Sequence, residues 1–431
     1  MFADRTKWNL APNRLSEALA RHRAAGKPLL DLTVSNPTEC GFDYDQRAVL
    51  EALQNPATLK YTPEPQGLVS ARQAVAEYYT EHGVHVGVDD IFLTTSTSEA
   101  YSYVFRLLCN PGDEILIPAP SYPLFDFLAD IQDIKPVRYP LVYDYGWQID
   151  FHALQQAITP RTRAVVVVHP NNPTGHFTKR AEAEKLNALC AERGLALVVD
   201  EVFLDFFLGP DRPSSFARNS VALTFALSGI SKIGGLPQMK VAWLVISGPQ
   251  TLKNDAEARL EVIADTFLSM NAPVQLALPV FLSQGPLFQR QLMERVRQNL
   301  AELDRQLTLQ EVCSRLEVEG GWYAVLRVSA TRSDEDLAIE VLTICGVSVH
   351  PGHLYDFSHD GYLVVSLISP SASFAQGMTK LLTLLTWVRH ISSSLATKNS
   401  TIKISLRLHK LVDEGLVKYG LWNKLLLNHK T

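Results

Sequence analysis

The chain has 431 residues, of which 46% are hydrophobic and 20% charged, and its formal net charge is −5. This length predicts two or three domains with sizeable cores. The mildly acidic charge argues against a nucleic-acid-binding protein and against attraction to anionic lipid, so the expected partners are small molecules.

The N-terminus and the cysteines indicate the compartment. MFADRTKWNLAPNRL contains no apolar stretch long enough for a signal peptide, and no segment approaches the roughly 18 apolar residues of a membrane span. The five cysteines form no CxxC pair, so we expect reduced thiols and no metal site. A cytoplasmic protein without membrane contact is the prediction.

Between about residues 90 and 246, short β-branched apolar runs alternate with helical patterns, which is typical of a parallel sheet covered by helices. We predict strands at 91–95, 114–120, 164–169, 195–200, 222–228 and 241–246. We predict helices at about 98–109, 122–132, 178–193 and 250–270. In open α/β sheets ligands bind at the carboxyl ends of the strands, so the residues that follow each run are the candidates for chemistry.

Further on, an amphipathic helix is predicted over 286–310, then strands within 320–328, 346–352 and 361–368 and helices near 333–345 and 373–390. The predicted fold class is α/β: a large domain with a mostly parallel sheet sandwiched by helices, plus a smaller α+β domain built from the N- and C-terminal segments. The expected parts are 1–50 and 286–390 for the small domain, 51–285 for the large domain, and 391–431 as a basic tail. A surface helix or a frayed end without a function of its own is an alternative interpretation of that tail.

Three polar residues follow apolar runs in the large domain. Asn172 lies in HPNNPTG, Asp200 ends LALVVD, and Lys232 lies in SGISKIGGLP. A carboxylate at the end of a buried strand needs a cation or a strong donor, and a buried lysine becomes nucleophilic near neutral pH. The three together are what a pyridinium cofactor held as a Schiff base requires. Taken singly, they could be a turn former, a helix cap or salt-bridge partner, and a surface lysine.

Other candidates lie at neighbouring strand ends. Thr97 and Ser98, in TTSTSEA, begin a helix whose N–H groups and dipole would favour a phosphate, although an ordinary capping box of Ser96 and Glu99 has the same pattern. Tyr122, in PAPSYPLF, could stack on a flat ring.

This set of motifs resembles the class I/II aminotransferases, the aspartate aminotransferase type of pyridoxal phosphate fold (fold type I), over about residues 30–390. The resemblance implies that Lys232 forms the Schiff base with pyridoxal 5′-phosphate. It also implies that Asp200 pairs with the pyridine nitrogen, while Asn172 donates to the ring oxygen.

The resemblance extends to the remaining candidates. Tyr122 matches the stacking aromatic, and Thr97, Ser98 and Lys240 match phosphate ligands. Tyr61 matches a tyrosine that such dimers extend to the phosphate of the neighbouring subunit, which implies a homodimer.

Three positions depart from the family pattern. Phe203 replaces a tyrosine three residues after the aspartate, and Gly229, with Ser228 beside it, replaces a serine three residues before the lysine. Val364 stands where an arginine usually binds the substrate α-carboxylate, and Arg327 or His353 could substitute for it.

The leading hypothesis is an aminotransferase that moves an amino group from an amino acid donor to a 2-oxo acid acceptor. A pyridoxal-phosphate-dependent lyase or decarboxylase of the same fold is the alternative, and Val364 makes it credible. A third hypothesis is a non-catalytic cofactor-binding regulator or scaffold. Regulators of this fold carry an N-terminal DNA-binding domain, and residues 1–50 are too short and not basic enough for one.

Overall fold

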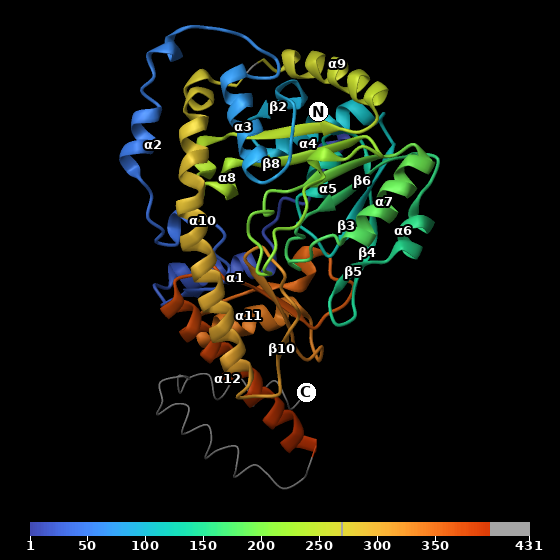
Figure 1. Cartoon of the computed structure of the whole chain (residues 1–431). Helices are drawn as coiled ribbons and strands as arrows, with labels where there is room; N and C mark the ends of the chain where they lie inside the picture. The colour runs from blue at the N-terminus through green and yellow to red at the C-terminus, as the bar shows by residue number, and fades with distance from the viewer. Residues whose placement is uncertain (269, 397–431) are drawn as a thin grey trace. The chain divides into compact units, whose positions relative to one another are not determined.

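The computed structural model describes residues 1–268 and 270–396 (Figure 1). The predicted basic tail lies almost wholly outside these residues. The described chain divides into two compact units. Unit 1 comprises Met1–Asn9, Asn36–Glu294 and Glu317–Tyr323, and unit 2 comprises Leu10–Ser35, Arg295–Leu316 and the described residues from Ala324 onward.

Unit 1 contains an eight-stranded sheet with the order β2-β9-β8-β7-β6-β3-β4-β5. The strands are β2 (Ile91–Thr94), β3 (Glu114–Ala119), β4 (Lys135–Tyr143), β5 (Trp147–Ile149), β6 (Thr162–Val168), β7 (Ala196–Asp200), β8 (Thr224–Gly229) and β9 (Ala242–Ser247). The central strands β4, β3, β6, β7 and β8 are parallel, as the continuous apolar runs predict. β9 is antiparallel to both β2 and β8, so the sheet is mixed.

Helices cover both faces of this sheet, and each face has its own core (Figure 1). The helices of unit 1 are α2 (Gln46–Ala52), α3 (Val69–Glu81), α4 (Thr97–Leu108), α5 (Phe125–Asp130), α6 (Phe151–Ala157), α7 (Arg180–Arg193), α8 (Ile230–Ile233), α9 (Gln250–Thr266) and the first part of α10 (Ala272–Leu307). One core joins α4, α5 and α9 to the sheet, and the other joins α3 and α10. Alternate residues of a strand enter opposite cores, as Leu244 and Val245 of β9 do.

Two strands of unit 1 were not predicted from the sequence. β4 has several polar and half-exposed positions, and β5 is a three-residue partner of β4 at the edge of the sheet. Neither has the continuous apolar run that marks the central strands. The helix predicted at 122–132 is shorter, because α5 spans only Phe125–Asp130.

Unit 2 has a four-stranded sheet of order β10-β11-β14-β13 and a pair formed by β1 and β12. Its strands are β1 (Leu30–Asp31), β10 (Ser314–Arg315), β11 (Tyr323–Arg327), β12 (Val347–Ser348), β13 (His350–Pro351) and β14 (Tyr362–Ser366). Its helices are α1 (Arg14–Ala24), α11 (Asp334–Cys345) and α12 (Ser371–Ala396). The predicted strands and helices of this α+β part are present.

Helix α10 is one continuous element of 36 residues that contains Pro279 and Pro286. Apolar positions at helical spacing predicted a helix that starts at position 286. Proline is disfavoured in a helix interior. Here the helix continues through both prolines, and the limits of the compact units fall after Glu294, within α10.

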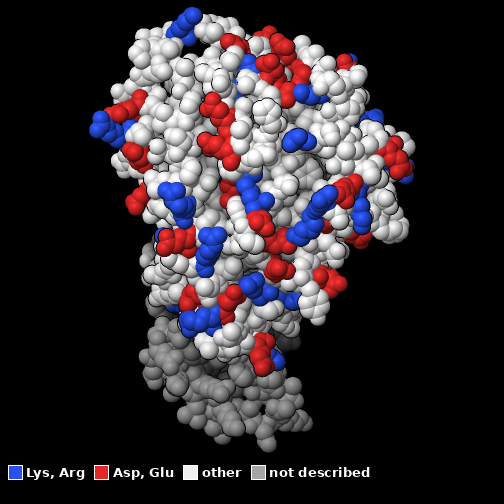
Figure 2. Space-filling model, in the orientation of Figure 1, with Lys and Arg blue, Asp and Glu red and all other residues white. Residues whose placement is uncertain are grey.

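Among the described residues, no helix is long and apolar enough to cross a membrane. None of the five cysteines forms a disulfide. Positive and negative side chains are interspersed over the face drawn in Figure 2, which lacks the continuous basic area of a nucleic-acid-binding surface.

Candidate active site

Lys232 lies in α8, which directly follows β8. Its Nζ lies 5.0 Å from the ring centroid of Trp322 and 5.6 Å from that of Phe203. Burial lowers the pKa of Lys232 from 10.5 to about 8, and the Asp200 carboxylate opposes this shift. A lysine with this pKa has a substantial neutral fraction near neutral pH, which a nucleophilic or proton-transferring amine requires.

Asp200 is the last residue of β7, between β6 and β8. Its Oδ2 accepts a hydrogen bond from the Tyr101 hydroxyl at 3.1 Å, and its Oδ1 accepts one from the Val202 N–H at 3.1 Å. Burial raises the pKa of Asp200 from 3.8 to about 6, although these two bonds and Lys232 act in the opposite direction. A cation placed beside this desolvated carboxylate would stabilise its charged form.

Three other candidates lie at the carboxyl ends of adjacent strands. Tyr122 follows β3, Asn172 follows β6, and Ser228 is near the end of β8. The Oδ1 of Asn172 and the Oγ of Ser228 are buried and have no hydrogen-bond partner among the described residues. Burial, and then the charge of Asp200, raise the pKa of Tyr122. Buried polar atoms without a partner at strand ends are groups that a bound polar ligand would satisfy.

Gly229 explains one departure from the family pattern. A Cβ atom at this position would lie 2.8 Å from the Cβ of Ala242 and 3.0 Å from the carbonyl oxygen of Val241. No side chain fits there without a shift of β9, so a serine is excluded at 229, and the nearest hydroxyl in β8 is that of Ser228.

Thr97 and Ser98 are the first two residues of α4. The Ser96 Oγ accepts from the Glu99 N–H at 3.2 Å, while the Glu99 carboxylate accepts from the N–H and hydroxyl of Thr95. The expected capping box is therefore only half formed. The first N–H groups of a helix have no intrahelical partner, and the dipole favours an anion near them.

Tyr122 is 46% exposed, and two further predicted site residues are exposed as well. Tyr61 is 76% exposed, and Lys240, at the end of a short 3-10 helix with φ of +53°, is also exposed. Their proposed contacts with a phosphate remain predictions.

Sequence reasoning missed Tyr101 and Trp322. Tyr101 lies four residues after Thr97 on α4, so helical spacing placed it on the same face as a candidate that had been recognised. Trp322 lies ninety residues from Lys232, and no spacing rule relates the two. Its side chain is fully buried, and its ring centroid lies 4.7 Å from that of Phe203.

The donor set fits pyridoxal phosphate. It provides an amine with a lowered pKa, a carboxylate suited to a protonated ring nitrogen, and a helix N-terminus suited to phosphate. Unpartnered polar atoms of Asn172 and Ser228 lie at neighbouring strand ends. Among the described residues, no cluster of His, Cys, Asp and Glu could hold a metal ion.

This fold and these strand-end residues define a large class of α/β enzymes, and comparison with known proteins identifies the family. The model of aminotransferase class I and II matches residues 27–369. The chain belongs to this family.

The chain is 30% identical over 259 residues to the glutamate-pyruvate aminotransferase AlaA of Escherichia coli K12, covering 60% of this chain and 64% of that protein. It is 33% identical over 272 residues to an alanine aminotransferase of Mycobacterium tuberculosis, covering 61% and 62% respectively. The matches therefore span less than two thirds of the length of these relatives. The solved structure of an alanine aminotransferase from Pyrococcus furiosus has a TM-score of 0.81 at 22% identity, covering 89% of this chain and 99% of that one, and shows the same fold.

Proposed function

We propose that this protein is a pyridoxal-phosphate-dependent aminotransferase that transfers an amino group between an amino acid and a 2-oxo acid. The observation that carries the proposal is the placement of Lys232 and Asp200 at the ends of the adjacent strands β8 and β7. Burial shifts the pKa values of the two groups toward each other, to about 8 and about 6. Opposed shifts of this kind are typical of sites that move protons near neutral pH. Family membership and the names of the relatives agree with this reaction.

Each residue has a proposed task. When bound, pyridoxal phosphate supplies an electron sink for the substrate α carbon. Asp200 would accept the hydrogen bond of the ring nitrogen and keep that nitrogen charged. Lys232 would hold the cofactor covalently and, once released, its Nζ would carry the proton between donor and acceptor atoms.

The remaining residues would bind and orient the cofactor. The hydroxyls and N–H groups of Thr97 and Ser98, at the start of α4, would hold the phosphate together with Lys240. Asn172 would donate to the ring oxygen, and Tyr122 would cover one face of the ring. Ser228 would add a hydroxyl next to Lys232.

Phe203 cannot donate the hydrogen bond that a tyrosine would give to the ring oxygen. It packs instead edge to face on Trp322. The two aromatic rings would stabilise the ammonium form of Lys232 through cation–π attraction. We infer that Phe203 and Trp322 stabilise the protonated form of Lys232 and do not bind the cofactor oxygen.

We also propose a cytoplasmic homodimer. The exposed Tyr61 would complete the phosphate site of a second copy, and five cysteines without a disulfide suit a reducing compartment. A sedimentation measurement that finds a fully active monomer would refute the dimer.

The substrate test concerns Val364, which is fully buried in β14. An aliphatic side chain offers no charge to a substrate carboxylate, and a lost carboxylate clamp costs about 1.5–3 kcal/mol. We therefore expect alanine and glutamate to be used with KM values in the millimolar range or above, measured with pyruvate or 2-oxoglutarate as acceptor. Sub-millimolar KM values that Arg327→Ala abolishes, and His353→Ala leaves unchanged, would show instead that Arg327 binds the carboxylate.

A further inference from the structure

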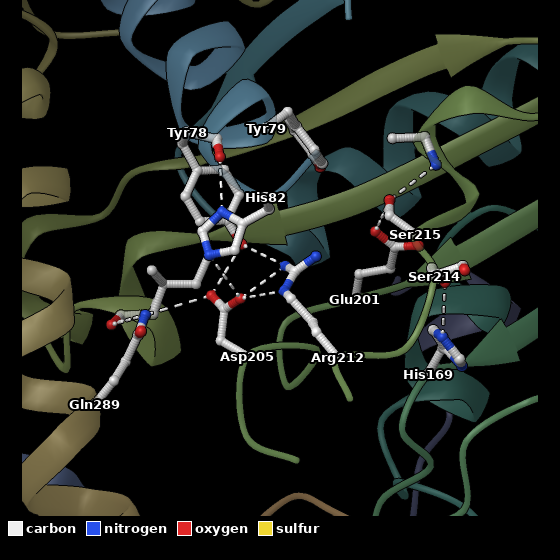
Figure 3. Close-up of polar contacts among 12 residues, drawn as sticks. Tyr78, Tyr79, His82, His169, Glu201, Asp205, Arg212, Ser214, Ser215 and Gln289 are labelled. Carbon is white, nitrogen blue, oxygen red and sulfur yellow. Dashed lines mark hydrogen bonds and ion pairs between the residues drawn. The ribbon is translucent and has the colours of Figure 1, made fainter. Parts of the chain in front are cut away.

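A buried polar cluster surrounds Asp205 in unit 1 (Figure 3). Its Oδ2 accepts a hydrogen bond from the Tyr78 hydroxyl at 2.9 Å, and its Oδ1 accepts from the Arg212 guanidinium at 2.7 Å. The Nε2 of His82 lies 3.6 Å from the same Oδ1. Tyr78 and His82 come from α3 and its C-cap, and Arg212 from the loop after β7. A carboxylate buried among this many donors is held in one position.

Asp205 is part of the turn that starts at Asp200. The Val202 N–H bonds the Asp200 side chain, and the Leu204 N–H donates to the Glu201 carbonyl at 3.0 Å. Next, the Phe206 N–H donates to the Phe203 carbonyl at 2.9 Å. Consecutive hydrogen bonds therefore run from Asp200 to the residues beside Asp205, so the position of Asp205 is tied to that of Asp200.

Gln289, on α10, contacts both Asp205 (Figure 3) and Ile233, the residue that follows Lys232. Its Nε2 donates to the Asp205 Oδ2 at 3.3 Å and to the Ile233 carbonyl oxygen at 3.1 Å. A primary amide has two N–H groups, and both are used here on acceptors. An amide turned the other way would place its oxygen against a carboxylate and a carbonyl, so the two contacts also fix its orientation.

Ile233 is the residue that follows Lys232 and the last residue of α8. The carbonyl groups at the end of a helix lack intrahelical partners. In α8, those of Ile230 and Lys232 accept from the N–H groups of Gly234 and Gly235, just beyond the helix. The Ile233 carbonyl obtains its partner from Gln289, and the Gly235 carbonyl obtains one from the Tyr44 hydroxyl at 2.9 Å. Side chains from distant parts of the sequence thus hold the short segment that carries Lys232.

We propose that Gln289 and Asp205 are positioning residues for Lys232. A single amide joins the turn that follows Asp200 to the turn that carries Lys232, and so fixes the lysine relative to the carboxylate. This inference rests on the proposed function of Lys232. It extends that function to two residues that touch neither the amine nor the cofactor-binding groups.

A matched control on the same helix distinguishes the proposed positioning role of Gln289 from a purely structural role. Gln306 is buried, whereas Gln289 is half-buried. The Nε2 of Gln306 likewise donates to a carboxylate, Glu302 Oε1 at 2.8 Å, and to a backbone carbonyl, that of Ala375 at 2.9 Å. Gln306→Leu removes the same two kinds of hydrogen bond as Gln289→Leu, and in addition the bond that the Thr379 hydroxyl donates to Gln306 Oε1 at 3.2 Å, but it does so in unit 2. It should therefore lose at least as much thermal stability as Gln289→Leu.

The experiment compares the wild type, Gln289→Leu, Gln289→Lys and Gln306→Leu. Competitive acetylation of the cofactor-free protein over a pH series, followed by peptide mass spectrometry, measures the titration of Lys232 itself. Because only the neutral amine reacts and burial lowers its pKa, the wild-type midpoint is expected at about 8. In Gln289→Leu the freed segment admits water to the amine, so the midpoint should rise toward 10.5 by roughly half a unit or more.

With the cofactor restored, kcat should fall about ten- to a hundredfold in Gln289→Leu, because a misplaced catalytic group is costly. Gln289→Lys keeps N–H donors for both acceptors and should recover much of the loss. Gln306→Leu should leave both the Lys232 midpoint and kcat unchanged.

Equal effects of Gln289→Leu and Gln306→Leu on the Lys232 midpoint and on kcat would overturn the proposal, and so would an unchanged midpoint in Gln289→Leu. The acetylation comparison does not depend on the cofactor. If pyridoxal phosphate fails to attach to Lys232 in the wild type, the proposed function is refuted, while the comparison still decides whether Gln289 positions the lysine.

Discussion

Lys232→Ala should abolish covalent attachment of pyridoxal phosphate and reduce turnover by at least about 10²–10⁴-fold, the usual contribution of a positioned acid–base group alone. The buried amine has a pKa lowered to about 8, and alanine offers neither the nucleophile nor the proton carrier. Borohydride treatment of the loaded wild-type protein followed by peptide mapping should find the modified residue at 232, and no modified residue in the variant.

Lys240 provides the control for this prediction, because it lies only eight residues further along the chain and is exposed. Lys240→Ala should weaken phosphate binding yet keep the label on Lys232. Label on Lys240, or on any other lysine of the wild type, would contradict the assignment.

Asp200→Asn should retain the fold and lose most activity. A neutral amide cannot hold a charged ring nitrogen, and the loss of a charge-assisted hydrogen bond of about 1.5–3 kcal/mol corresponds to roughly a ten- to a hundredfold lower rate or more. Of the two groups that donate to the carboxylate, the Tyr101 hydroxyl and the Val202 N–H, only one can donate to the amide oxygen of the asparagine, because the other then faces the NH₂ group. Steady-state kcat and the melting temperature, measured together, separate loss of chemistry from loss of fold.

Glu201 is the matched control, since it is a buried acid directly beside Asp200 in sequence. Its carboxylate accepts bonds from the Ser215 hydroxyl and the Phe216 N–H, both at 2.6 Å (Figure 3). Burial raises the pKa of Glu201 to about 7, so Glu201→Gln imitates a form that is already populated near neutral pH. This variant should keep most of its turnover. Near-normal activity of Asp200→Asn, or equal losses in the two variants, would contradict the role of Asp200.

The parts of the site that were predictable are those at the ends of apolar runs. Asp200, Asn172 and Ser228 each follow or end a central strand, and the parallel order of those strands brings them to one edge of the sheet. Local sequence also predicted the start of α4 at Thr97. In these cases burial of the strand accounts both for the apolar run in the sequence and for the place of the polar residue at the strand's end.

Other contacts around the candidate site cannot be predicted from the local sequence. The contacts of Trp322 with Lys232 and Phe203, and of Gln289 with Ile233 and Asp205, depend on how distant segments pack. A half-buried glutamine such as Gln289 resembles any other polar position of an amphipathic helix in the sequence. The sheet is mostly parallel, as predicted, but the sequence did not show that β9 is antiparallel, because the direction of a strand is set by its connection and not by its apolar run.

The central claim is that this chain transfers an amino group through a cofactor held at Lys232, and single-turnover stoichiometry tests it most directly. The loaded protein is mixed with excess alanine or glutamate and no oxo acid acceptor, while cofactor absorbance, 2-oxo acid, ammonia and carbon dioxide are followed. We predict one equivalent of 2-oxo acid per site, a matching change in absorbance, and its reversal when a second oxo acid is added. Continuous release of ammonia or carbon dioxide without an acceptor would instead show a lyase or a decarboxylase and contradict the account.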